Sequence, residues 1–155
     1  MTKERYLRSI RLLAECFHAF QRISDTNVRK LGLTPAQFDI IATLGNTPGM
    51  PFRELGEKTL ITKGTLTGIV DRLEERSLVI RTSCMEDRRS MIVRLTDKGQ
   101  AEFERLFPPH IQFCKQTFLG YSDEDFATLD TELAKLKRQL DAALAAPDVD
   151  SCSGT

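Results

Sequence analysis

The sequence lacks the features that mark membrane, secreted and metal-binding proteins. Its 155 residues contain no apolar run of the ~18 residues that a membrane span needs, and no signal peptide follows Met1. Cysteines are few and far apart, without the paired spacing of a zinc site: Cys16, Cys84, Cys114 and Cys152. We therefore expect a cytoplasmic protein with reduced thiols that contacts no membrane and binds no metal or cofactor.

Motifs for catalysis are missing as well. The sequence has no glycine-rich phosphate loop and no nucleophile elbow, and its two histidines, His18 and His110, lack a convincing acid–base partner. These absences argue against an enzyme. The composition, 41% hydrophobic and 28% charged, is that of a globular domain.

The net charge is zero, and the distribution of charge is more informative than its sum. Basic side chains outnumber acidic ones in residues 1–31 and 76–94, and the balance reverses from residue 100 onward. The second of these segments holds Arg76, Arg81, Arg88, Arg89 and Arg94. Such a division favours a protein with one face against phosphate, although ordinary local variation also produces it.

Both ends of the chain have the pattern of long amphipathic helices. In residues 1–31 one apolar face is formed by Tyr6, Ile10, Leu13, Phe17 and Phe20. A last helix from Ser122 carries a heptad seam of Phe126, Leu129, Leu133, Leu136, Leu140 and Ala143. So small a monomer offers these faces little to pack on, so we expect a homodimer. Between them, Pro108 and Pro109 should bend or break the helix that contains them.

The middle of the chain predicts a helix, a short helix, a third helix and a β-hairpin. Thr34 and Gln37 form a capping box before a helix that ends at Gly45. Pro51 opens the short helix, and Thr62 is a good N-cap for the third. Residues 78–82 and 90–95 are β-branched and partly alternating, with a polar tip at 83–89.

This order of elements predicts a mainly α fold: a winged helix-turn-helix with a small β-hairpin wing and long terminal dimerisation helices. We assign residues 1–31 to an N-terminal dimerisation helix and 32–99 to the DNA-binding domain. Residues 100–146 form the C-terminal dimerisation helices, and 147–155 a disordered tail.

The third helix suits the major groove of DNA because its outward face is short and polar. This face consists of Thr62, Lys63, Gly64, Thr65, Thr67 and Gly68, and Arg72 lies on the same helix. Threonine can contact base edges and thymine methyl groups, and lysine can reach guanine or phosphate. Gly64 and Gly68 weaken the helix, which a close approach either to DNA or to another helix would justify. A merely solvated face would also look like this.

The tip of the hairpin sets two arginines beside a carboxylate. An arginine held by Asp87 would lose little entropy on entering a narrow minor groove. The alternative is a surface ion pair between Asp87 and Arg88 or Arg89 that contributes little.

From Leu33 to Gly99 the sequence resembles the MarR family of bacterial regulators. The resemblance rests on LTPAQFDIIATL, FRELGEKTLITKGTLTGIVDRLEERSLV, the Asp87-Arg88-Arg89 wing and LTDKG at 95–99. It implies a dimeric repressor that binds a pseudo-palindromic double-stranded operator, with residues 62–76 as its recognition helix. It also implies that Arg89 enters the minor groove, that Asp87 orients it, and that Arg88 lies on phosphate.

Two positions depart from the pattern of the family. Ser77 stands where the family usually has a glycine before the first wing strand, so the turn there should differ slightly. Cys84 stands where small residues or proline are frequent, which places a thiol on the wing.

The resemblance further implies a small aromatic or phenolic effector that enters a cleft beside the winged domain and releases DNA. Side chains that could line this cleft are Phe17, His18, Phe20, Arg22, Phe38, Phe107, His110 and Phe113. At helical spacing, the same aromatic residues would equally serve as core.

Two alternatives to an effector-controlled regulator stay open. Some members of the family sense hydroperoxides through a cysteine on the first helix, where Cys16 lies here. Fewer residues separate Cys16 from Leu33 than in those sensors, and buried cysteines usually act as small hydrophobes. The other alternative is a helical dimeric interaction protein that does not bind DNA.

Overall fold

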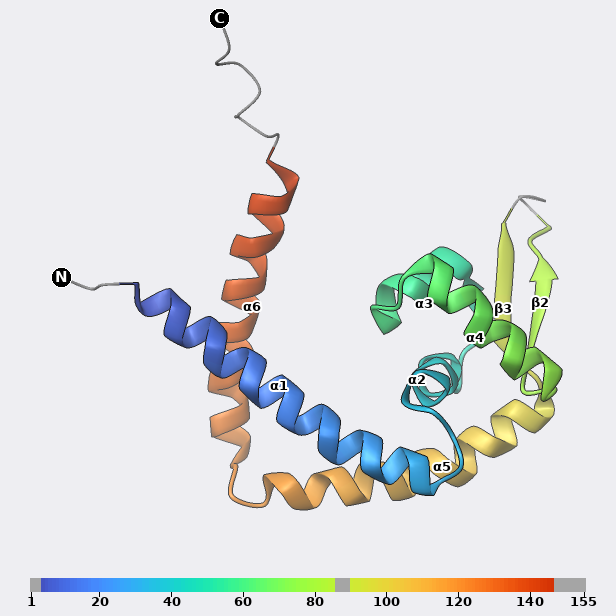
Figure 1. The fold of residues 1–155 in the computed structure, drawn as a ribbon, viewed down its shortest axis with the longest axis horizontal. Coiled ribbons are helices and arrows are strands. Elements are labelled where there is room, and N and C mark those ends of the chain that lie inside the picture. Colours follow the sequence, from blue (N-terminus) through green and yellow to red (C-terminus); the bar gives the residue numbers. More distant parts are fainter. Residues whose placement is uncertain (1–3, 86–89, 147–155) are drawn as a thin grey trace, which may run out of the picture. The chain divides into compact units, whose positions relative to one another are not determined.

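The computed structural model describes residues 4–85 and 90–146 (Figure 1). These residues fall into two compact units, one that ends at Lys115 and one that begins at Gln116. The first unit holds the helices α1 (Arg5–Lys30), α2 (Pro35–Leu44), α3 (Phe52–Thr59), α4 (Lys63–Glu75) and α5 (Asp97–Lys115). Its strands are β1 (Met50–Pro51), β2 (Val79–Ser83) and β3 (Met91–Leu95). The second unit holds the 3-10 helix η1 (Gln116–Phe118) and α6 (Asp123–Ala145). The predicted tail, 147–155, lies outside the described residues, and the domain boundaries assigned from the sequence stay predictions.

The predicted fold class is confirmed, with one added strand. β2 and β3 form the expected antiparallel hairpin, in which Val79 lies opposite Leu95. β1 pairs with the other edge of β3, with Met50 opposite Val93, so the sheet has the order β1-β3-β2. A strand of two residues shows no periodicity, which is why sequence reasoning missed it.

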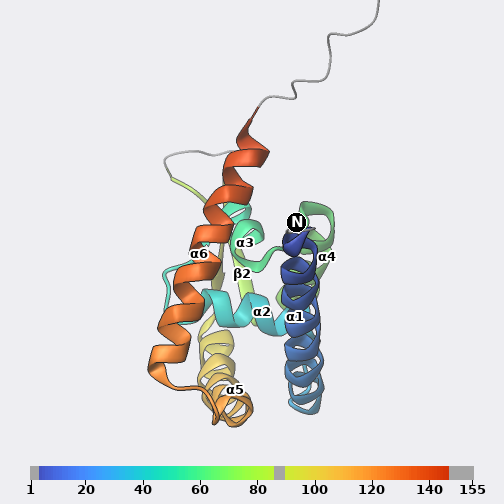
Figure 2. The same ribbon diagram turned by 90° about the vertical axis from the view of Figure 1, so that its left-hand side faces the viewer.

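The core of the first unit lies around α2. Ile40, Ile41 and Leu44 are fully buried, and they pack with apolar side chains of α3 and α4: Leu55, Leu66, Val70 and Leu73. Figure 2 shows α2 lying across α1 and α5, and α2 contacts both helices. The helix predicted to read DNA, α4, contacts α2 and is thereby linked through α2 to these two long helices.

Both ends of α2 follow the sequence prediction. Thr34 Oγ1 accepts from the backbone N–H of Gln37 at 3.2 Å, and Gln37 Oε1 accepts from the N–H of Thr34 at 3.1 Å, which completes the capping box. The helix ends at Leu44, before Gly45. A Cβ at Gly45 would lie 2.4 Å from the Phe103 ring, so glycine there lets α5 pack closely against α2.

Pro108 and Pro109 do not break their helix, because α5 runs unbroken from Asp97 to Lys115, and of the two predicted outcomes only a bend stays a prediction. Each proline removes one helical hydrogen bond. Buried side chains on both sides of the pair, Phe103, Leu106 and His110, hold the helix against α1 and α2 and offset that loss.

The base of the wing is held close to the first turn of α5. Thr96 Oγ1 donates to the carbonyl of Ser77 at 2.6 Å, and the N–H of Thr96 donates to the carbonyl of Leu78 at 3.1 Å. A Cβ at Gly99 would lie 1.9 Å from the Leu78 carbonyl oxygen, which leaves no space for any side chain. The glycine of the LTDKG segment is thus required by the approach of α5 to the wing.

Ser77 adopts the left-handed conformation, with φ of 60°. It follows the end of α4, where its N–H donates to the Glu74 carbonyl at 2.8 Å and the N–H of Leu78 donates to the Leu73 carbonyl at 2.9 Å. These two bonds form a Schellman motif, whose left-handed position favours glycine. The turn predicted to differ from the family keeps the geometry of a glycine turn, and serine there is strained.

Ser77→Gly should therefore stabilise the protein. We expect the free energy of unfolding to rise by about 1 kcal/mol, because glycine has no Cβ to clash in this conformation. Ser83→Gly is the matched control. Ser83 lies in β2, where glycine lowers stability by roughly 0.5–1 kcal/mol. Urea unfolding of both variants measures the difference, and equal effects of the two substitutions would contradict strain at Ser77.

Candidate nucleic-acid interface

The outward face of α4 is open, short and polar. Thr62, Lys63, Gly64, Thr65, Thr67, Gly68 and Arg72 are all exposed, while the opposite side of the helix buries Leu66, Val70 and Leu73. A Cβ added at Gly64 or Gly68 would have no neighbouring atom within 4 Å. Packing against a helix of this chain therefore does not require either glycine, and the face is free to approach a ligand closely.

Hydroxyl groups on this face bond mostly to their own helix. Thr62 occupies the N-cap position, as predicted, but its side chain does not cap the backbone; Thr62 Oγ1 donates to Thr65 Oγ1 at 3.2 Å. Thr67 Oγ1 donates to the Lys63 carbonyl at 3.0 Å. The threonine rotamers are thereby held by local bonds. Because Thr62 does not cap the backbone, its side chain leaves the N–H groups of the first turn of α4 open to an anion.

Arg81 fixes α4 to the wing. Its side chain, only 19% exposed, forms ion pairs with Glu74 (Nη1 to Oε2, 2.6 Å) and Asp71 (Nη2 to Oδ1, 2.5 Å) of α4. Its backbone N–H donates to Glu74 Oε1 at 3.1 Å, and its guanidinium lies 5.9 Å from the centre of the Phe52 ring. Burial lowers the pKa of Arg81, but hydrogen bonds to Asp71 and Glu74 outweigh it and raise that pKa overall.

Sequence reasoning missed this role, because Arg81 counts as one more basic residue of the wing. The available signal was the spacing of Asp71 and Glu74, which places two carboxylates on one face of α4. Since they neutralise Arg81, it is not available to phosphate. Arg76 and Arg94, by contrast, form no ion pair within residues 4–85 and 90–146.

The wing closes where the N–H of Cys84 donates to the Ser90 carbonyl at 2.9 Å, and Cys84 is half-buried there. The predicted minor-groove residues, Asp87, Arg88 and Arg89, lie outside the described residues, so their roles stay predictions.

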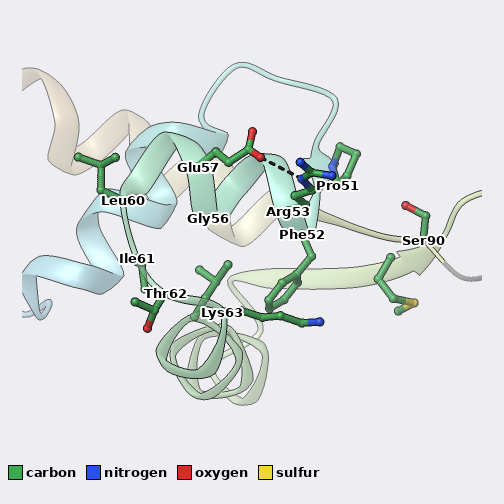
Figure 3. A pocket seen from close by; sticks show the side chains of 12 residues that line it. Pro51, Phe52, Arg53, Gly56, Glu57, Leu60, Ile61, Thr62, Lys63 and Ser90 are labelled. Atoms are coloured by element: carbon green, nitrogen blue, oxygen red, sulfur yellow. Dashed lines mark hydrogen bonds and ion pairs between the residues drawn. The ribbon is translucent and has the colours of Figure 1, made fainter. Parts of the chain in front are cut away.

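Between α3, the start of α4 and β3 lies a hollow of about 640 Å³. Figure 3 shows the ring of Phe52 and the side chain of Lys63 pointing into the same space, with Arg53 paired to Glu57 on its upper side. This hollow borders the exposed first turn of α4. It gives the candidate surface a concave, mostly apolar edge beside the wing, and Lys63 is a cation on that edge.

Known proteins share this arrangement. The sequence model of the MarR family matches residues 33–91. The chain is 29% identical to the HTH-type transcriptional regulator MhqR of Bacillus subtilis, over 83% of this chain and 90% of the relative. The chain belongs to the MarR family.

Two solved structures extend the likeness to the fold. The transcriptional repressor CouR, bound to a 23-mer DNA duplex, has a TM-score of 0.70 and 28% identity over 81% of this chain and 89% of its own. NadR, in complex with 4-hydroxyphenylacetate, has a TM-score of 0.70 and 25% identity over 80% and 88%. As a MarR-family member, the chain is a DNA-binding transcriptional regulator. Its named relatives are regulators, not enzymes.

The structure separates the predicted effector residues of this MarR-family protein into three groups. Phe17, Phe20 and Phe38 line a cavity of about 620 Å³ between α1 and α2. Arg22 and Phe113 line a shallower hollow of about 470 Å³. His18 and His110 line neither, and Phe107 packs against the core, stacked between Phe38 and Phe103.

His110 is a structural residue of the helix packing in this unit. It is 5% exposed, its Nδ1–H donates to Asn27 Oδ1 at 2.8 Å, and its Nε2 accepts from Ser24 Oγ at 3.2 Å. Burial lowers the pKa of His110, which favours the neutral ring. The ring stands edge-on to Phe38, so His110 joins α5 to both α1 and α2.

The remaining predictions concern thiols, metals and membranes. Cys16, the predicted redox candidate, is exposed on α1, and its redox role stays a prediction. Cys114 is buried with its Sγ 3.5 Å from His110 Nε2. In the part of the chain that the structure describes, no group of three potential ligands could hold a metal ion. Within the same part, no helix has both the length and the apolar character of a membrane span.

Proposed function

We propose that this MarR-family regulator is a repressor that binds a pseudo-palindromic operator as a homodimer and leaves it when a small aromatic ligand binds. The observation that carries the proposal is the exposed face of α4, which is short, polar and held in place by Arg81. CouR, a repressor bound to DNA, supports the same use of this fold.

The contacts proposed for DNA divide by chemistry. Thr65 and Thr67 suit base edges, and Lys63, with Arg72, suits phosphate or guanine. Thr62, Gly64 and Gly68 allow the helix backbone to come close. At the wing tip, Arg89 enters the minor groove, held by Asp87, and Arg88 contacts phosphate.

The homodimer is supported by apolar side chains that neither unit covers. On α1, Tyr6, Leu7, Ile10 and Leu13 are all exposed, and on α6, Leu129, Leu133 and Leu140 are exposed in the predicted heptad seam. Exposed apolar faces of this length mark interaction surfaces, and two-fold pairing of α1 and α6 with a second copy would cover them.

Ile10→Glu tests the dimer and the operator together. A carboxylate buried in the interface should convert the protein to a monomer by light scattering and abolish the gel shift, since one subunit has only half of the DNA contacts. Arg8→Glu, on the opposite side of α1, is the matched control and should remain dimeric. DNase footprinting of the wild type should show two half-sites about 10 base pairs apart. A stable wild-type monomer or a single half-site would refute the proposal.

A further inference from the structure

The cavity between α1 and α2 has aromatic walls, and the segment that leads into α4 lines it as well. Its volume is about 620 Å³, and its aromatic side chains are Phe17 and Phe20 of α1 and Phe38 of α2. Thr59, the last residue of α3, and Leu60 and Ile61, which lead toward α4, line it on another side. A molecule in this cavity would therefore touch α1, α2 and the segment that leads into the recognition helix.

Two carboxylates line the same cavity, Asp25 from α1 and Asp39 from α2. Asp25 is half-buried, whereas Asp39 is exposed to solvent. Partial burial and the charge of Asp25 raise the pKa of Asp39. No lysine or arginine within residues 4–85 and 90–146 forms an ion pair with either of them. The pair is thus a site of uncompensated negative charge beside apolar walls.

Among the residues that line the cavity Lys58 is the one basic residue, and it forms an ion pair with Glu54. Lys58 Nζ lies 3.0 Å from Glu54 Oε1, one turn earlier on α3. The charge that a ligand would meet in this cavity is therefore that of Asp25 and Asp39.

We propose that the effector of this regulator is an aromatic amine whose protonated nitrogen lies between Asp25 and Asp39 and whose ring packs on Phe17, Phe20 and Phe38. The inference rests on the proposed function, since it assigns a chemical class to the ligand that releases DNA. Ammonium groups pair with carboxylates and are attracted to aromatic faces. An aromatic acid would add a third negative charge to the site and be repelled.

Three compounds with the same phenol ring and a two-carbon arm test the charge preference directly. They are tyramine, which is a cation, tyrosol, which is neutral, and 4-hydroxyphenylacetate, which is an anion. By titration calorimetry on the wild-type protein we expect tyramine to bind about 10-fold more tightly than tyrosol, and 4-hydroxyphenylacetate not to bind.

Asp39→Asn and Asp25→Asn keep the shape of the cavity and remove one charge each. Both should bring the affinities for tyramine and tyrosol to within about 3-fold of each other. Glu104→Gln is the matched control, because Glu104 is an exposed carboxylate of the same unit that lines no described cavity. This variant should keep the wild-type preference. Thermal melting of each variant verifies folding, and the two Asp→Asn positions check each other if one variant does not fold.

The inference is overturned if none of the three compounds binds, if the anion binds as tightly as the amine, or if the preference survives both Asp→Asn changes. It is also wrong if Asp39→Asn weakens the dimer and leaves the preference unchanged, since the carboxylates would then contact the partner. A gel shift with the footprinted operator separates the two hypotheses. Charge-selective binding of tyramine without release of DNA would uphold the site and refute effector control.

Discussion

Arg89→Ala should lower operator affinity by about 10- to 100-fold and leave the melting temperature nearly unchanged. This is the expected result if Arg89 occupies the minor groove, because the negative potential of a narrow minor groove attracts arginine. Arg89 would also neutralise phosphate charge, so the slope of log affinity against log salt should fall by about one per subunit. Fluorescence anisotropy at several salt concentrations measures both quantities.

Asp87→Ala provides the internal control for Arg89. If Asp87 acts only by orienting the guanidinium, its removal should cause a milder loss of affinity, and the double variant should be little worse than Arg89→Ala alone. Lower thermal stability of Arg89→Ala with an unchanged salt slope would make the arginine structural. The DNA surface proposed for the wing would then be wrong.

Arg81→Met should lower the free energy of unfolding by about 2 kcal/mol, because Asp71 and Glu74 would lose their charged partner. The loss of stability should stay moderate, because Asp71 and Glu74 are partly exposed and solvent screens their charges. Operator affinity should fall as well, because α4 loses its attachment to β2 and the Phe52 ring loses a cation above it.

Arg53→Met is the matched control for Arg81. Arg53 makes one ion pair with Glu57 on the surface of α3, so its loss should change stability by no more than about 0.5 kcal/mol. Urea unfolding compares the two variants. A double-mutant cycle of Arg81→Met with Glu74→Gln should give a coupling energy of about 1 kcal/mol. Equal stability of the Arg81 and Arg53 variants would show that Arg81 has no special role.

The parts of the fold predicted from the sequence are those fixed by local chemistry. The capping box at Thr34 and Gln37 and the helix end at Gly45 depend on neighbouring residues, so the sequence displays them directly. The hairpin is similar, because its alternation and its turn lie within one short segment. The exposed face of α4 was also predictable, since the helical period of about 3.6 residues per turn determines which residues lie on the same side of a helix.

The features that sequence reasoning missed depend on residues far apart in the chain. β1 forms because Met50 pairs with Val93 of β3. Arg81 is neutralised because α4 places Asp71 and Glu74 within ion-pair distance of it. The continuity of α5 through its two prolines depends on packing against α1 and α2, which local propensity does not include. Asp25 and Asp39 belong to different helices, so their meeting in one cavity is visible only in the fold.

The missing side chain at Gly99 sets a limit on how this regulator can vary. Because even a methyl group would overlap the Leu78 carbonyl oxygen, an alanine at this position would move β2 away from α5 or α5 away from the core. Either shift would change how far the wing projects beyond the tip of α4. The proposed distance between the DNA contacts of the wing and those of α4 therefore depends on Gly99, which is not itself a proposed DNA contact. Substitutions at Gly99 should be rare in any chain that keeps the same operator spacing.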